Sequence, residues 1–75
     1  MVEIGGVYQN FKTGNTYRVV ALGKLSETLE DMVIYEAQYE NPVSNIWIRP
    51  QAMFEEKIEW PKGSGILVER FERIK

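Results

Sequence analysis

Residues 32–40 read Met-Val-Ile-Tyr-Glu-Ala-Gln-Tyr-Glu, and this stretch decides the fold class. Apolar and aromatic residues alternate in it with polar ones, which is the period of a β-strand with one buried face. Val33, Tyr35, Ala37 and Tyr39 are therefore expected to share the face that packs on a core. The Asn-Pro pair that follows ends the strand, because proline has no N–H for a hydrogen-bonded ladder.

Short segments of the same kind continue on both sides of this strand. Strands are predicted at residues 7–9, 17–22, 45–49, 58–60 and 66–71, with turns at 13–15 and 61–65, a polar loop at 23–31 and one helical turn at 50–54. Five or six short strands predict an all-β fold, a small and partly open antiparallel barrel, because closure removes exposed strand edges. Residues 1–75 are expected to form this single domain.

The composition excludes several classes of function. The chain has nine Lys or Arg, eleven Asp or Glu, a formal net charge of −2, and neither histidine nor cysteine. Zinc fingers, disulfide frameworks and catalysis by Cys or His are thereby excluded, and no cofactor is expected. The mild acidity argues against a general nucleic-acid binder, which needs an excess of positive charge. No apolar run is long enough to span a membrane and no export signal is visible, so a cytoplasmic location is expected.

The hexapeptide NIWIRP, which ends at residue 50, is the strongest candidate for a binding site. Strand alternation places Ile46 and Ile48 on one face, and Trp47 and Arg49 on the other. The isoleucines are expected in the core, so that Trp47 and Arg49 face outward together. An outward Trp beside an Arg is typical of binding hot spots. The alternative is structural: Trp47 covers a barrel end and Arg49 pairs with an acid such as Glu36.

The acidic segment of residues 26–31 is the second candidate. Its carboxylates repel one another and favour a solvated loop. Thr28 and Asp31 fit a capping box, which gives both residues a local structural role. The functional alternatives are a divalent metal site and a loop that docks a basic partner. No metal is expected, because the alternating acids and the glycine of a calcium loop are absent.

Catalytic arrangements are weak in this sequence. Lys24 and Ser26 are the only nucleophile–base pair that the spacing offers. Glu27 and Asp31 stand in an exposed loop, which does not supply the burial that separates two carboxylate pKa values. The glycines are turn residues without the spacing of a phosphate-binding loop. The chain is therefore not expected to be an enzyme.

An ordered set of short motifs resembles one known family. The motifs are Gly6-Val7-Tyr8, Phe11-Lys12 with Gly14, Tyr17-Arg18-Val19, Ser26-Glu27-Thr28, Val33-Ile34-Tyr35, Trp47-Ile48-Arg49-Pro50, Met53-Phe54-Glu55 and Arg70-Phe71. From Gly6 to Ile74 the chain resembles the bacterial family named domain of unknown function 1653, whose members are similar to SH3-type barrels. The resemblance implies that fold and no particular activity. Asn10 and Leu25 stand where the family pattern commonly has histidines, which favours a binding module over an enzyme.

These observations together predict a cytoplasmic module that binds a peptide, a protein or a small polar ligand. Trp47 and Arg49 are its predicted anchor, and the further candidate binding residues are Tyr35, Ser26, Glu27, Thr28, Met53 and Phe54.

Three alternatives stay open beside this prediction. The first is a nucleic-acid-binding barrel, which requires Arg18, Lys24, Arg49 and Lys57 to gather on one face. The second is an accessory domain of an enzyme. The third concerns assembly, since the strand at residues 45–49 could pair across a two-fold axis to form a homodimer.

Overall fold

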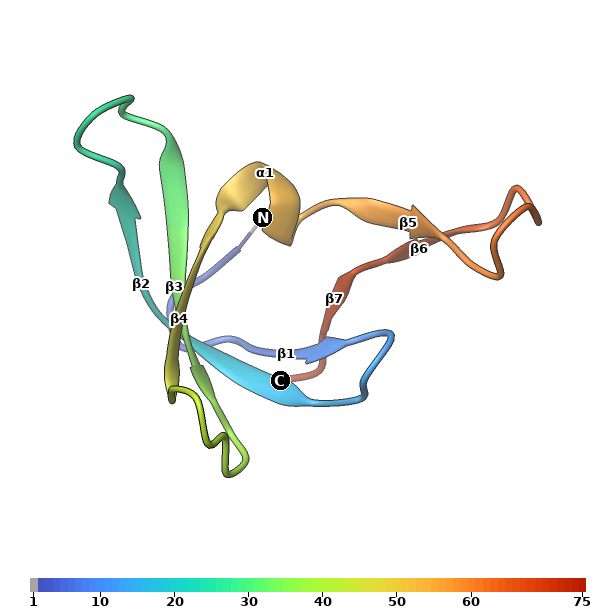
Figure 1. The fold of residues 1–75 in the computed structure, drawn as a ribbon, viewed down its shortest axis with the longest axis horizontal. Helices are drawn as coiled ribbons and strands as arrows, with labels where there is room; N and C mark the ends of the chain where they lie inside the picture. Colours follow the sequence, from blue (N-terminus) through green and yellow to red (C-terminus); the bar gives the residue numbers. More distant parts are fainter. Residues whose placement is uncertain (1) are drawn as a thin grey trace.

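The computed structural model describes residues 2–75 and confirms the all-β class. In this part of the chain the elements are β1 (Val7–Asn10), β2 (Thr16–Lys24), β3 (Asp31–Ala37), β4 (Ile46–Pro50), α1 (Gln51–Phe54), β5 (Lys57–Glu59), β6 (Leu67–Glu69) and β7 (Phe71–Arg73). Five strands form an antiparallel sheet in the order β4-β3-β2-β1-β7, and β5 and β6 form a separate ribbon (Figure 1). The domain is therefore barrel-like and partly open, with β4 and β7 at the two edges of its main sheet.

Two strand boundaries differ from the prediction for local reasons. The strand expected at residues 66–71 is divided at Arg70, whose N–H leaves the ladder and donates to the carbonyl of Glu56 at 3.0 Å. The strand expected to reach residue 40 ends at Ala37, after which the N–H of Gln38 donates to the carbonyl of Thr16 at 2.9 Å. The described chain therefore has one strand more than the upper end of the expected range.

The core lies on one face of β1, β2 and β3, under α1. Val19, Val33 and Phe54 are the largest fully buried side chains. The ring of Phe54 stacks on that of Phe71 with centroids 4.3 Å apart, and its edge contacts Tyr35 at 5.3 Å. Such ring pairs contribute about 0.5–1.5 kcal/mol beyond the area they bury. α1 is thus held in place by an aromatic cluster rather than by its own length of one turn.

The predicted core face of β3 is confirmed. Val33, Tyr35 and Ala37 are buried, and they alternate with partly buried residues. We call the sheet face that carries these three side chains the inner face, and the opposite one the outer face. β2 pairs with β3 along its length, with a bulge at Val20 where the register shifts between the residues on either side. A bulge increases the local twist and helps the sheet to curl around its inner face.

Hairpins and the β5–β6 ribbon project from this core as arms (Figure 1). The Cα radius of gyration is 12.9 Å, whereas a compact domain of this length has a value of about 11 Å. The predicted turn between the first two strands is present but begins earlier, at residues 11–13 instead of 13–15. Gly14 in the same connection has a φ of +76°, which other residues rarely adopt.

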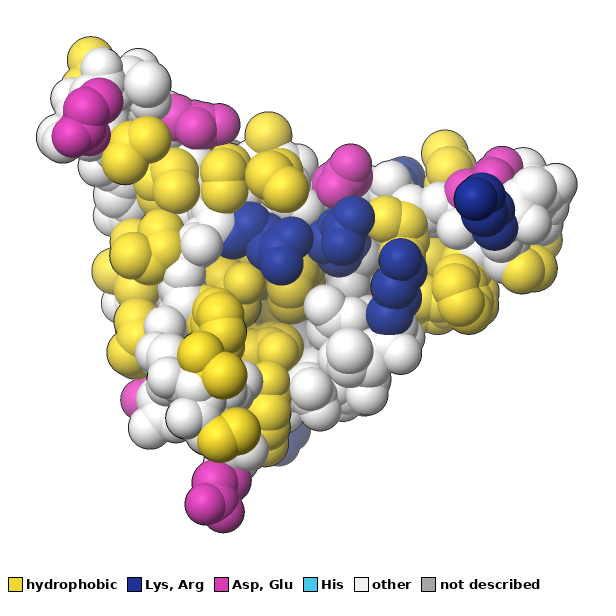
Figure 2. Space-filling view, viewed as in Figure 1, with side chains coloured by type: hydrophobic (Ala, Val, Ile, Leu, Met, Phe, Trp, Pro, Cys, Tyr) yellow, Lys and Arg dark blue, Asp and Glu magenta, His cyan; other side chains and the backbone are white. Residues whose placement is uncertain are grey.

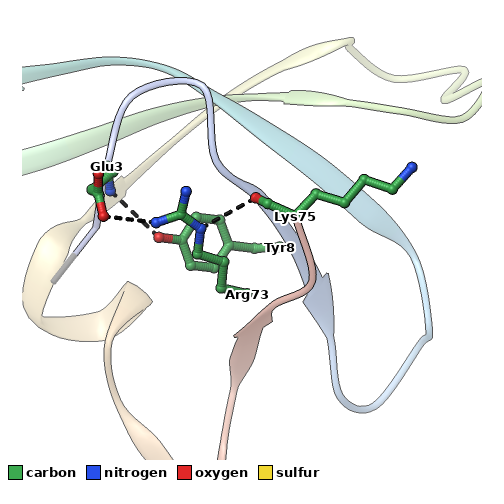
Figure 3. A network of polar contacts seen from close by, with 4 residues as sticks. All are labelled: Glu3, Tyr8, Arg73 and Lys75. Carbon is green, nitrogen blue, oxygen red and sulfur yellow. Dashed lines mark hydrogen bonds and ion pairs between the residues drawn. The ribbon is translucent and has the colours of Figure 1, made fainter.

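Polar contacts tie the two ends of the chain together (Figure 3). The Nη1 atom of Arg73 lies 2.7 Å from Oε1 of Glu3, and its Nε donates to the carbonyl of Lys75 at 3.2 Å. The backbone N–H of Glu3 donates to the hydroxyl of Tyr8 at 3.4 Å. The N–H of Val7 donates to Lys75 O at 3.0 Å. The ion pair between Arg73 and Glu3 thus joins the last strand to the start of the chain.

Candidate functional site

The predicted orientation of β4 is wrong. Ile46 and Ile48, which were expected in the core, are exposed by 45% and 64%. Trp47 and Arg49, which were expected to face outward, are half-buried, and Trp47 packs against the core cluster. The alternation itself was predicted correctly, because Trp47 and Arg49 do share a face, but that face is the inner one.

The pairing of β4 with β3 explains this orientation. Trp47 lies opposite Tyr35, and Arg49 lies opposite Val33. Residues directly opposite each other in an antiparallel pair point to the same side of the sheet. The known inner face of β3 therefore places Trp47 and Arg49 on the inner face as well. Glu36 lies on the outer face opposite Ile46, so the alternative pairing of Arg49 with Glu36 is also wrong.

Arg49 is held against aromatic rings in this position. Its Nε–H donates to the hydroxyl of Tyr35 at 3.3 Å, and its Cζ lies 5.4 Å from the centroid of the Phe71 ring. The second contact is within the range of a favourable cation–π interaction. Both contacts orient the guanidinium without neutralising its charge.

The remaining donors of this group have no partner within the chain as described. Across residues 2–75, the two terminal nitrogens of Arg49 make no hydrogen bond, and Arg49 forms no ion pair. The hydroxyl of Tyr35 accepts the bond from Arg49, so its own proton is left to donate elsewhere. We call Tyr35, Trp47 and Arg49 the Arg49 site. It presents donors and a positive charge, which is the chemistry that recognises a carboxylate or phosphate.

Tyrosine hydroxyls extend this inner face without adding negative charge. The hydroxyls of Tyr17 and Tyr39 lie 2.8 Å apart, and Nδ2 of Asn41 donates to that of Tyr39 at 3.0 Å. The ring of Tyr17 contacts that of Tyr35 edge-on at 5.2 Å. Burial, together with the hydrogen bond to Tyr39, raises the pKa of Tyr17 to about 12. Tyr17 therefore stays neutral at physiological pH and does not repel an anion.

Trp47 forms the wall of the Arg49 site toward the β3–β4 connection. Its indole Nε1 donates to the carbonyl of Ser44 at 3.0 Å. That donor is therefore already used within the fold. A ligand would meet the exposed part of the indole ring rather than its N–H.

The helical turn α1 separates two residues that were predicted together. Phe54, which was predicted as a candidate binding residue, is 1% exposed and belongs to the core, so it offers almost no surface to a ligand. Met53 is 47% exposed on the same turn. Successive residues of a helix point about 100° apart, so one turn with a buried Phe presents its neighbour to solvent.

The Ser26-Glu27-Thr28 loop lies apart from the Arg49 site. It forms the exposed tip of the β2–β3 hairpin, the arm at the upper left of Figure 1. Oγ of Ser26 donates to Glu27 at 2.7 Å, and this bond lowers the pKa of that carboxyl. Thr28 accepts from the N–H of Glu30 at 3.3 Å within a turn, and no helix follows, so the predicted capping box is wrong. Asp31 pairs instead with Lys24.

A cavity of about 410 Å³ opens beside the chain termini. Its walls include the rings of Tyr8 and Phe71 and the carboxylates of Glu55 and Glu69. Arg73 also lines it, and the ion pair with Glu3 that Figure 3 shows already neutralises this cation. The two rings are only 5% and 6% exposed, so little aromatic surface is accessible there. The Arg49 site offers the stronger unpaired charge.

The arrangement of basic residues does not meet the requirement for the nucleic-acid alternative. Arg18 lies opposite Glu36 on the outer face, whereas Arg49 lies on the inner one. Lys24 is paired with Asp31 at the base of the hairpin tip. These residues therefore do not gather on one face.

The homodimer alternative depends on the edge of β4, which is partly blocked. The hydroxyl of Ser44 accepts from the N–H of Ile46 at 3.1 Å and donates to its carbonyl at 2.8 Å. Pro50, at the other end of the strand, has no N–H. Both features are ways in which edge strands avoid pairing with another chain.

Residues 2–75 contain neither a membrane-spanning helix nor a metal-binding cluster of side chains. No helix there is long and apolar enough to cross a membrane. No three His, Cys, Asp or Glu side chains in this range come together as a set that could hold a metal ion.

Sequence reasoning missed the inner-face aromatic residues of the site. Tyr17 and Phe71 were assigned to strands only, yet their rings lie 5.9 Å apart and both contact Tyr35. The sequence did contain one signal for their position, which was the predicted core-facing side of residues 33–39. Pairing the next strand against it as a hairpin would have placed its aromatic residue on that side.

Comparisons with known proteins support a family assignment. The family model described as "Protein of unknown function (DUF1653)" matches residues 6–73. The crystal structure of a DUF1653 protein from Bordetella bronchiseptica is similar over 96% of this chain and 87% of that chain, with 26% sequence identity and a TM-score of 0.79. A search of curated proteins found no significant match. The family expected from the ordered motifs is confirmed.

Proposed function

The chain belongs to the DUF1653 family, whose function is unknown, and we propose from its own geometry that it is a binding module for ligands that carry a carboxylate. The observation that carries the proposal is the unpaired guanidinium of Arg49, held by Tyr35 and Phe71 with its terminal nitrogens free of partners across residues 2–75. The role is binding rather than catalysis, in keeping with a sequence that lacks histidine and cysteine.

The physical argument concerns the cost of leaving a half-buried cation unpaired. Burial removes water from a charge, and proteins usually compensate by an ion pair or hydrogen bonds. Arg49 has one hydrogen bond and a ring contact, which orient it but leave most of its donors unused. A planar carboxylate accepts two parallel N–H bonds from a guanidinium, and such bonds are among the strong ones in proteins. Arginine recognises this geometry, whereas lysine does not reproduce its fork.

The ligand beside the carboxylate is proposed to be apolar or aromatic. Trp47 and the tyrosine rings border Arg49 and offer flat surfaces for contact. A single charge and one ring contact give a dissociation constant of about 1 mM for a minimal ligand.

The cytoplasmic location expected from the sequence is kept as part of the proposal, and imaging of a fluorescent fusion protein tests it.

The test is a titration followed by NMR with N-acetyl-phenylalanine and with the amide of the same compound. The two probes differ only in the carboxylate. We expect the acid to shift the Arg49 Nε–H and Trp47 resonances in a saturable way, and the amide to shift them at least about tenfold less. Arg49→Gln should abolish the response, and Arg49→Lys should weaken it.

The matched control is Arg18→Gln, which removes an exposed positive charge from the outer face. It should bind the acid as the unmodified chain does. Thermal unfolding of each variant checks that the fold is kept. Equal responses to acid and amide, or an unchanged response in Arg49→Gln, would show that Arg49 does not recognise a carboxylate.

A further inference from the structure

One face of the molecule carries a row of basic side chains although the chain as a whole is acidic. Figure 2 shows Lys and Arg side chains in a row across the middle of the face that it displays, from the region of β4 and α1 toward β5. Hydrophobic side chains border this row, and Asp and Glu side chains appear at the ends of the arms and also directly beside the row near the centre of the view (Figure 2). The formal net charge of −2 therefore conceals a row of positive charge on this face.

Contacts along the chain connect three basic residues in this part of the molecule. Arg49 lies over the ring of Phe71, and Arg70 is the residue immediately before that ring. The carbonyl of Arg70 accepts from the N–H of Phe11 at 2.9 Å. Lys12 follows at the exposed turn between β1 and β2. We call Arg49, Arg70 and Lys12 the basic row.

The three cations differ in how far they are already paired. Arg70 is bound to Glu56, with its Nη2 3.1 Å from Oε2. Lys12 and Arg49 form no ion pair within residues 2–75. The row thus has an unpaired charge on either side of a neutralised one, so a ligand needs at least two separated negative groups to use it.

An exposed pair of aromatic rings lies next to the Lys12 end of the row, since Phe11 directly precedes Lys12. The rings of Phe11 and Trp60 meet edge-on with centroids 5.8 Å apart, and they are 40% and 46% exposed. Large aromatic residues at this exposure are enriched in interfaces and are less common on bare surfaces. The pair gives the basic row an apolar border on the side away from Trp47.

We propose that the basic row docks an acidic peptide segment, with one carboxylate at Arg49, further carboxylates toward Lys12, and a bulky apolar residue against Phe11 and Trp60. This inference rests on the proposed carboxylate binding at Arg49 and extends it to a partner class. A peptide fits better than a nucleic acid, because Arg70 is already paired with Glu56 and Arg18 lies on the outer face. The row therefore offers separated single charges rather than the run of cations that a phosphate backbone requires. Charge complementarity of this kind sets specificity and association rate.

The test compares two probes on the full chain. The first is a fluorescently labelled peptide of alternating Glu and Leu ending in Trp, measured by anisotropy, and the second is the small N-acetyl-phenylalanine acid. Lys12→Gln and Arg18→Gln form a matched pair, since each removes one exposed positive charge and they lie on different parts of the surface. At physiological salt we expect Lys12→Gln to weaken peptide binding about threefold and Arg18→Gln to leave it unchanged.

The small acid separates this inference from the proposal on which it rests. Lys12→Gln should bind the small acid as before, while Arg49→Gln should lose both probes. If the small acid binds and the peptide does not bind more tightly, the peptide inference is overturned and the carboxylate proposal stands. If neither probe binds, both are overturned. Equal peptide binding by Lys12→Gln and Arg18→Gln, or tighter binding of single-stranded RNA of the same charge, also overturns the inference.

Discussion

Substitution of Phe54 by smaller residues tests whether this residue, which the sequence predicted to bind a ligand, instead stabilises the core. Phe54 is 1% exposed, stacks on Phe71 at 4.3 Å and meets Tyr8 and Tyr35 edge-on, each at 5.3 Å. Phe54→Ala removes all three ring contacts and leaves a cavity under α1. Substitutions of this kind cost about 3–5 kcal/mol of unfolding free energy.

That loss is large for so small a protein. Domains have about 0.05–0.15 kcal/mol of stability per residue, which gives about 4–11 kcal/mol for 75 residues. With a urea m-value of about 1 kcal/mol/M, a loss of 3 kcal/mol lowers the unfolding midpoint by about 3 M. Phe54→Leu keeps most of the volume and should cost only about 1 kcal/mol. It remains folded even where the alanine variant does not.

The assay is urea unfolding followed by tryptophan fluorescence, with Met53→Ala as the matched control from the same helical turn. Met53 is 47% exposed, so its truncation should change the unfolding free energy by less than about 0.5 kcal/mol. Phe54→Leu should also bind the small acid within about twofold of the unmodified chain. A cost below 1 kcal/mol for Phe54→Ala, or an equal cost for Met53→Ala, would refute the placement of α1.

Three other predictions concern the surroundings of the site. The pKa of Tyr17 is raised from its ordinary value of 10.0 to about 12, so the stability that the neutral hydroxyl contributes is complete below pH 10 and is lost as the pH rises to 12. Unfolding measured at alkaline pH should show this loss of stability, and the Tyr17→Phe variant should not show it. Glu59 accepts from the N–H groups of Gly63 at 2.7 Å and Gly65 at 3.0 Å, so Glu59→Ala should speed amide exchange of both, and unchanged exchange would contradict this role. Ser44→Ala frees the edge groups of Ile46, so light scattering should show more self-association than in the unmodified chain, and a monomer at all concentrations would show that Ser44 does not protect the edge.

Much of the local structure could be predicted because local chemistry determines it. The turn at Gly14 needs a positive φ, and the alternation of residues 33–37 matches one buried face. Such signals act within a few residues of where they appear. The Asn-Pro pair marked the end of the third strand wrongly, because β3 already ends at Ala37. The predicted number of strands was too low by one, because the strand expected at residues 66–71 is interrupted at Arg70. The interruption depends on a hydrogen bond to Glu56, fourteen positions earlier in the chain, and no local sequence pattern indicates that bond.

The orientation of β4 could not be obtained in the same way. Alternation separates Ile46 and Ile48 from Trp47 and Arg49, but it does not say which pair faces the core. Two isoleucines are the more apolar pair, so composition favoured burying them. The packing of Trp47 against the core cluster and the ring contact of Arg49 with Phe71 bury the other pair. A long Arg side chain can cover apolar surface while its charged end stays accessible.

The sequence by itself therefore determined the fold class, the turns, the family and the pairing of Trp47 with Arg49 on one face. Tertiary structure alone decided that this face is the inner one, that Phe54 is core, and that the Ser26-Glu27-Thr28 loop lies elsewhere. The physical reason is that period and turn chemistry are properties of neighbouring residues. Which side of a strand is buried depends on the register and rings of segments that are distant in the chain.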